Sequence, residues 1–121
     1  MIVTRAGEGD SGFVEEVTFD NGLVLSSDFR PDCCTINILD FGQLHVGRKF
    51  PTMTGEQFLA AIVRKDDGFI IKDSLNVPAW VQARSIQNGY YSANVSLVVT
   101  YGGITLGGAQ DYEHDFEGEV E

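Results

Sequence analysis

Residues 13–25 read Phe13-Val-Glu-Glu-Val-Thr-Phe19, then Asp20-Asn21-Gly22, then Leu23-Val-Leu25. The outer runs hold valine, threonine and phenylalanine, which fit the pleated surface of a strand. An Asn-Gly pair between two such runs is among the strongest short signals for a β-hairpin, because both residues tolerate the positive φ of a tight turn. The stretch therefore predicts a hairpin, and with it an antiparallel sheet.

A second hairpin is expected over residues 90–106, near the other end of the chain. Val95, Leu97 and Val99 fall on alternate positions, which is the spacing that places side chains on one face of a strand. Gly102-Gly103 then supplies a turn into a short returning strand. Shorter strands are expected at residues 2–5, 33–39 and 69–71.

A helix is predicted over residues 54–66, between the two hairpins. Thr54 followed by Gln57 has the spacing of a capping box, in which each residue satisfies a backbone N–H of the other. Phe58 and Ile62 then lie four positions apart and form one apolar stripe.

A second helix is predicted over residues 77–88. Asn76 is a suitable N-cap, Pro78 suits the first helical turn, and Asn88-Gly89 is a typical stop. Hairpins near both ends and two helices between them indicate an α+β fold, a mainly antiparallel sheet with both helices packed on it.

The acidic charge of the chain is concentrated in its last eleven residues. The sequence holds 18 Asp and Glu against 8 Lys and Arg, a formal net charge of −10. Six of these acids lie in residues 111–121, so this segment carries −6 and the rest of the chain −4. Gly107-Gly108 is a flexible joint before it. We therefore expect one α+β domain, residues 1–106, and an acidic C-terminal arm, residues 107–121.

Acidic residues occupy every second position of this arm, with Tyr112, Phe116 and Val120 among the residues between them. In an extended chain this pattern gives one acidic edge and one largely aromatic or apolar edge. A tail that only adds solubility does not need the aromatic residues. The arm is therefore predicted to bind a partner, through Asp111, Tyr112, Glu113, Asp115, Phe116 and Glu117.

The charge balance makes direct binding to nucleic acid or to an anionic membrane unexpected, since both require a basic patch. No apolar run approaches the ~20 residues of a membrane span. Residues 1–7 lack the basic-then-apolar layout of a secretion signal. We expect a cytoplasmic protein, or one in a particle assembled in the cytoplasm, with a basic protein surface or further copies of itself as partner.

The glycines, the histidines and the cysteines are the residues that could suggest a cofactor, a metal site or catalysis. Gly7, Gly9 and Gly12 have the spacing of a dinucleotide-binding loop, but the acids between them would repel phosphate and a strand, not a helix, is predicted next. His45 and His114 are the only histidines and do not form a zinc pattern with the two cysteines. A solvent-exposed turn is the expected use of the glycines, and no cofactor or metal ligand is predicted.

Cys33 and Cys34 are adjacent, which strains a disulfide, so two reduced thiols are expected. Either thiol with His45 could form a nucleophile and base, but such a coincidence is more often structural. No serine has the context of a nucleophile elbow. The sequence therefore predicts no catalytic residue and no enzyme activity.

Two functions use the alternation in the arm. The first is assembly: the protein is a structural component of a larger particle, a virion-type shell, connector or tube, whose arm adds a strand to a neighbouring subunit. The second is inhibition: acids ~6.7 Å apart imitate nucleic-acid phosphates and block a basic partner. Whether the arm packs on its own chain or on another is open, and so is a third arrangement in which residues 104–121 form an edge strand of the domain's own sheet.

Overall fold

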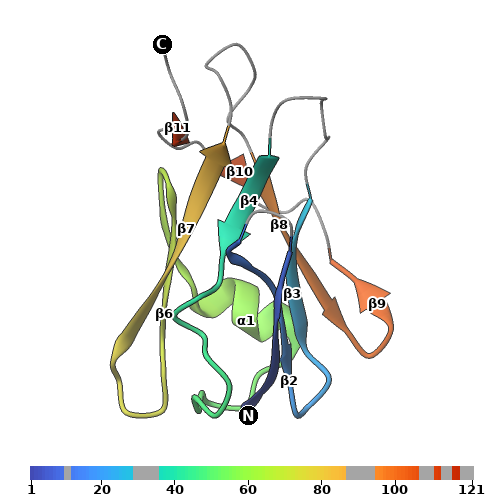
Figure 1. Ribbon diagram of the computed structural model, residues 1–121. Coiled ribbons are helices and arrows are strands. Elements are labelled where there is room, and N and C mark those ends of the chain that lie inside the picture. The colour runs from blue at the N-terminus through green and yellow to red at the C-terminus, as the bar shows by residue number, and fades with distance from the viewer. Residues whose placement is uncertain (10–11, 29–35, 87–94, 107–110, 113–115, 118–121) are drawn as a thin grey trace.

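The described part of the chain folds into two β-sheets packed face to face, with one short helix between them (Figure 1). A computed structural model describes residues 1–9, 12–28, 36–86, 95–106, 111–112 and 116–117. Nearly all strand pairs are antiparallel, and the coarse prediction of a mixed fold built on a mainly antiparallel sheet is confirmed. The prediction of two helices is wrong.

The first sheet has the order β1-β2-β3-β8-β10, and β9 also pairs with β8. Its strands are β1 (Val3–Glu8), β2 (Val14–Phe19), β3 (Val24–Asp28), β8 (Val95–Tyr101), β9 (Ile104–Thr105) and β10 (Asp111–Tyr112). The second sheet has the order β11-β7-β6-β5, with β4 also on β7. Its strands are β4 (Ile36–Asp40), β5 (Val63–Lys65), β6 (Gly68–Lys72), β7 (Pro78–Ile86) and β11 (Phe116–Glu117).

The first predicted hairpin is confirmed as β2 and β3, and its turn follows the sequence closely. The N–H of Gly22 donates to the carbonyl of Phe19 at 3.1 Å, and the N–H of Phe19 donates to the carbonyl of Leu23 at 2.8 Å. Of the Asn-Gly pair only Gly22 has a positive φ, 91°. The Asn21 amide instead donates to the carbonyl of Met53 at 2.9 Å, which ties the turn to the loop before the helix.

The second predicted hairpin is confirmed as β8 and β9. Gly102 and Gly103 have φ of 61° and 81°, the left-handed pair that a two-residue hairpin turn requires. Residues 90–94 of the predicted stretch lie outside the described residues. The short strand expected at residues 69–71 is also confirmed, as part of β6.

The first predicted helix is present but shorter than expected. It is α1 (Gly55–Ala61), and the capping box is complete: Gln57 N–H donates to Thr54 Oγ1 at 3.2 Å and Thr54 N–H to Gln57 Oε1 at 2.9 Å. The helix ends at Ala61 because Ile62 is extended and leads directly into β5. The described residues contain no helix with the length and apolar character to cross a bilayer.

The predicted helix over residues 77–88 is corrected: residues 78–86 form a strand, β7, and residues 87–88 lie outside the described residues. Asn76 does not cap a helix: it has a φ of 63° and lies in the turn that joins β6 to β7. Ala79, Val81 and Ala83 are fully buried while the residues between them are partly exposed, a period of two and therefore a strand pattern. Pro78 is tolerated because it is the first residue of the strand.

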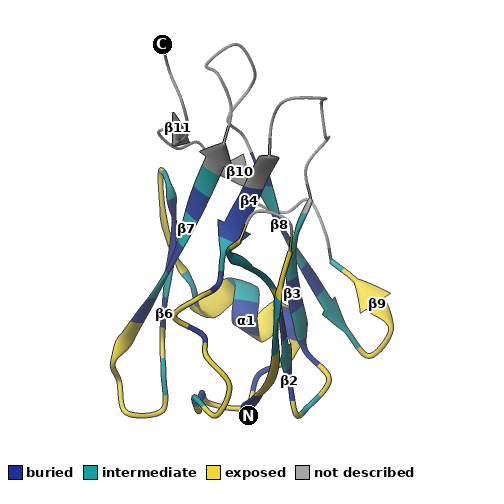
Figure 2. Ribbon diagram, in the orientation of Figure 1, coloured by how far each residue is buried: buried dark blue, intermediate teal, exposed yellow. Residues whose placement is uncertain are grey.

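The core lies between the two sheets and is continuous from one to the other (Figure 2). Phe58 of α1 is fully buried and packs edge-to-face on Phe69 of β6, with ring centroids 6.1 Å apart. Phe19 and Phe50 form a second edge-to-face pair at 5.7 Å. Burial of each such side chain contributes about 1.5–3 kcal/mol, so α1 stabilises the fold by filling the space between the sheets.

Candidate interaction surface

Four of the six predicted partner-binding residues lie in two short strands. Asp111 and Tyr112 form β10, which pairs antiparallel with Ser96 and Val95 of β8. Phe116 and Glu117 form β11, which pairs parallel with Ser85 and Ile86 of β7. The other two predicted residues, Glu113 and Asp115, lie outside the described residues. The segment therefore pairs first with one sheet and then with the other.

Strand β11 lies on the same edge of β7 as β6. Gln82 of β7 pairs with both β4 and β6, so these two strands occupy opposite edges of β7. Strand β4 also pairs with Ser85 and Ile86, so β11 must take the opposite edge there. That is the edge of β7 on which β6 lies, and the first residue of β6, Gly68, is opposite Gln82. Strand β11 thus continues this edge beyond the end of β6.

Strands β9 and β10 share one edge of β8 in the same way. Strand β3 pairs with β8 from Ser96 to Thr100, while β9 also pairs with Thr100 and β10 with Ser96. A regular ladder from the Thr100–Thr105 pair would place residue 109 opposite Ser96, but Asp111 is there. Two additional residues therefore separate β9 from β10.

Together these pairings hold parts of residues 104–117 against the chain's own two sheets. Strands β10 and β11 lie where β7 ends at Ile86 and β8 begins at Val95 (Figure 1). The sequence left open whether this segment packs on its own chain or on another. Residues 104–106, 111–112 and 116–117 pack on the chain's own sheets. The backbone positions of Asp111 and Glu117 are thereby fixed by pairing.

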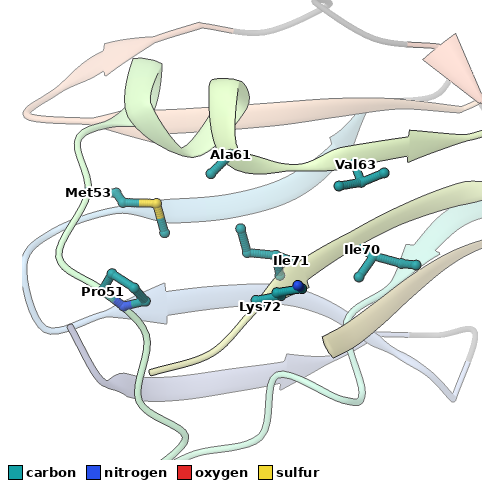
Figure 3. Close-up of a pocket in the computed structure, with 7 residues that line it drawn as sticks. All are labelled: Pro51, Met53, Ala61, Val63, Ile70, Ile71 and Lys72. Atoms are coloured by element: carbon teal, nitrogen blue, oxygen red, sulfur yellow. The ribbon is translucent and has the colours of Figure 1, made fainter. Parts of the chain in front are cut away.

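An apolar pocket of about 390 Å³ lies at the edge of the second sheet, between α1 and β6 (Figure 3). We call it the β6 pocket. Figure 3 shows Met53 and Ile71 pointing toward one another across it. Its seven lining residues come from the loop before α1, the end of α1, β5 and β6: Pro51, Met53, Ala61, Val63, Ile70, Ile71 and Lys72.

The β6 pocket exists because β5 is too short to cover its neighbour. Strand β5 pairs only with residues 68–70, since the chain turns from α1 into β5 at Ile62. On that edge, Ile71 and Lys72 have no strand beside them in the described part of the chain. The gap is closed by apolar side chains instead of by a ladder.

Backbone polar groups of Lys72 face this gap. Asp73 N–H donates to the carbonyl of Val77 at 2.9 Å, and Ala83 N–H donates to the carbonyl of Asp67 at 2.8 Å. Residues 67 and 73 therefore point their backbone groups toward β7, and alternation along the strand turns those of Lys72 the other way. The edge of β6 at the pocket offers one N–H and one C=O.

One basic side chain, Lys72, lines the pocket. Arg64 and Lys65 follow Val63 of the lining along β5, and the acids Asp66 and Asp67 come directly after them. Arg64 and Lys65 of β5 and Lys72 of β6 are exposed. The neighbouring carboxylate of Asp73 is already engaged, 3.0 Å from Arg48. It also accepts the N–H groups of Val77 and Leu75, each at 2.9 Å. The Val77 hydrogen bond first, and then those from Leu75 and Arg48, hold the pKa of Asp73 below its ordinary value, against an opposing effect of burial.

The glycine motif begins inside β1 and ends before β2. Gly7 belongs to β1 and pairs with Glu16, and β2 follows Gly12, as expected from the sequence. A groove of about 490 Å³ runs beside Gly7 and Gly9, lined by Glu8, Glu15 and Glu16 with Arg5. Three carboxylates in this groove would repel a pyrophosphate, so its charge does not suit a dinucleotide.

Of the other candidate reactive residues, His45 is exposed and its Nδ1 lies 3.2 Å from the carbonyl oxygen of Val46. Cys33, Cys34 and His114 lie outside the described residues, so their predicted roles stay predictions. No group of three His, Cys, Asp or Glu side chains that could hold a metal ion occurs within the described ranges.

The β6 pocket was missed because residues 54–66 were expected to form one helix, which would have covered it. The β-branched pair Ile62-Val63 is the signal that could have indicated the change from helix to strand.

Comparison with protein-family models, with curated proteins and with solved structures found no match for this chain.

Proposed function

We propose that the chain is a non-enzymatic assembly protein of the cytoplasm, or of a particle assembled there. In this role it is a structural component of a virion-type shell, connector or tube, and residues 107–121 contact a neighbouring copy or another protein with a basic surface. The observation that supports this is the pairing of β10 and β11 with both sheets. Residues 111–112 and 116–117 are already paired with their own body, so these residues lose less conformational entropy when the segment binds.

In this proposal the acidic and the aromatic residues of the segment have different roles in binding. Asp111, Glu113, Asp115 and Glu117 face basic groups of the partner and steer its approach. Tyr112 and Phe116 are the anchors, since buried aromatic residues carry most of the energy of many interfaces. The six acids within eleven residues give the segment its preference for a basic surface.

The alternative, an inhibitor that imitates nucleic acid, needs the acids in one continuous line. The segment instead changes sheet between Tyr112 on β8 and Phe116 on β7. A line of evenly spaced charges is not expected across such a change. This supports assembly over mimicry.

The test reverses the charge of the segment without shortening it, with Glu113→Lys, Asp115→Lys and Glu117→Lys in one chain. The matched control reverses three exposed acids elsewhere, Glu8, Asp20 and Glu56. Light scattering from 1 to 500 μM at low and high salt measures the mass in solution. We expect the natural chain and the control to form oligomers and the segment variant to remain monomeric with an unchanged melting temperature.

Oligomers of equal mass and equal salt dependence in all three proteins would overturn the proposed contact surface. A natural chain that stays monomeric throughout would overturn self-assembly. Binding of that monomer to a basic protein, lost in the segment variant, would then favour the inhibitor.

A further inference from the structure

The β6 pocket has the three features of a site for an extended peptide. Its lining is apolar, with Met53 and Ile71 nearly buried and Val63 at the rim 53% exposed. The edge of β6 offers the backbone N–H and C=O of Lys72 for strand pairing. Peptides that add a strand to a sheet use both elements, the backbone for affinity and a side-chain pocket for specificity.

The charge around the pocket indicates an acidic peptide. Lys72 lines the pocket and Lys65 lies on the neighbouring strand, and both are exposed. Asp73, the nearest acid in the sequence, is held by Arg48 and does not neutralise Lys72. A partner that places one apolar side chain between carboxylates would fit this arrangement.

This chain contains such a segment directly after β11. The sequence Gly118-Glu119-Val120-Glu121 places a valine between two acids. In an extended peptide Glu119 and Glu121 fall on one face and Val120 on the other. The valine matches the apolar lining, and the two acids are opposite in charge to Lys65 and Lys72.

The segment of the same chain cannot reach its own β6 pocket. Strand β11 runs parallel to β7, from Ser85 toward Ile86, whereas Ile70 of the pocket lies opposite Trp80. Ile86 lies six positions after Trp80 along β7, a distance of about 20 Å at ~3.3 Å per residue. The four residues 118–121 span at most ~14 Å, and the strand before them, β11, runs in the direction away from the pocket.

We propose that the β6 pocket is the acceptor for residues 118–121 of a second copy of this chain. The inference rests on the proposed assembly function and names its partner site. Donor and acceptor are different parts of the chain: β11, which precedes the donor, pairs with β7 at Ile86, whereas the acceptor lies beside residues 70–72 of β6, which pair with β7 from Trp80 to Pro78. The contact is therefore head-to-tail, and it generates closed rings, of which a reciprocal pair is the smallest, or open filaments.

A pair of complementary variants tests this directly. The acceptor variant carries Lys65→Glu and Lys72→Glu, and the donor variant carries Glu119→Lys and Glu121→Lys. Each alone is expected to associate about tenfold more weakly than the natural chain, because like charges meet at the contact. A control chain with Arg5→Glu and Lys49→Glu has the same charge change as the acceptor variant, on exposed residues outside the pocket lining, and is expected to assemble normally.

Two measurements identify the contact. A chain that carries all four substitutions has the opposite charges on both surfaces, and native mass spectrometry is expected to show its assembly restored. Trp80, the one tryptophan of the chain, pairs with Ile70 of the pocket, so its fluorescence is expected to change with concentration in the natural chain and not in the acceptor variant. Melting curves check that each variant is folded.

The outcomes separate this inference from the proposed function. Normal assembly of the acceptor variant overturns the β6 pocket as acceptor, while the segment variant of the previous test still decides the proposed function. Failure of the fourfold variant to regain assembly overturns the pairing of Lys65 and Lys72 with Glu119 and Glu121. Loss in both single-surface variants with restoration in the fourfold variant supports it.

Discussion

Arg48 and Asp73 form an ion pair at 3.0 Å that joins two loops at one end of the molecule. Arg48 also donates to the carbonyl of Gln43 at 2.8 Å, and the side chain of Gln43 accepts the N–H of Trp80 at 2.9 Å. Asp73 organises the β6–β7 turn through the N–H groups of Leu75 and Val77. One carboxylate therefore fixes both the turn and its contact with the preceding loop.

Asp73 is expected to make the stability of the protein depend on pH in the acid range. Its pKa is lowered in the folded state from an ordinary value of 3.8, so its contribution is complete above about pH 5. The contribution is lost as pH falls through the lower folded value, because the charged form is the one the fold stabilises. Asp73→Asn keeps an acceptor for the turn but removes this charge. Urea unfolding from pH 2 to 7 is expected to show a flatter profile for the variant, and parallel profiles would contradict the assignment.

The capping box gives a prediction with a rough magnitude. Thr54→Ala is expected to lower the free energy of unfolding by about 1 kcal/mol, because Gln57 N–H loses its acceptor. Gln57→Ala removes the reciprocal bond to Thr54 N–H. Since the two bonds support each other, the double variant should cost less than the sum of the single variants. Strict additivity in chemical denaturation would show that they act independently.

Both hairpins and the start of α1 could be predicted because local chemistry decides them. Gly22, Gly102 and Gly103 take left-handed conformations that few other residues adopt, and the Thr54–Gln57 pair satisfies its own backbone. These signals lie within a few residues and do not depend on the rest of the fold.

The identity of residues 78–86 could not be predicted, because the local signal fits two structures. Asn76, two residues before Pro78, suits a helix N-cap, but Asn also tolerates the left-handed turn that Asn76 occupies. Packing between β4 and β6 decides in favour of a strand. Tertiary pairing also explains why the predicted helix is too long. Val63, Arg64 and Lys65 pair with β6 and therefore form a strand instead of the end of the helix.

In the acidic segment, the alternation of residue types predicts the backbone conformation but not the pairing partner. Alternation indicated an extended conformation, and residues 111–112 and 116–117 are strands. Alternation alone does not choose between the chain's own sheet and another, because any open strand edge offers the same backbone groups. The β6 pocket was beyond prediction for a related reason, since it depends on where β5 stops pairing with β6.

Phe58 is expected to be the most costly side chain to remove from α1. It is fully buried between the sheets against Phe69, so Phe58→Ala should lower the free energy of unfolding by about 3–5 kcal/mol. Leu59, its partly exposed neighbour on the helix, is the control, and its replacement by alanine should cost clearly less. Equal losses in urea denaturation would mean that α1 does not insert Phe58 into the core.

Gly68 is expected to be intolerant of any side chain, for a reason that differs from that of the turn glycines. Its φ is 153°, and a Cβ built at this position would collide with the carbonyl oxygen of Val81 on β7. Gly68→Ala must therefore push β6 away from β7, at a cost of about 3 kcal/mol or more. Gly22→Ala is the matched control, because Gly22 has a φ of 91° but no atom within 4 Å of the added carbon, so only backbone strain of about 1–2 kcal/mol applies. Unfolding free energies of the two variants are expected to differ in this order. An equal loss would show that the close approach of β6 to β7 at Gly68 is relieved without cost.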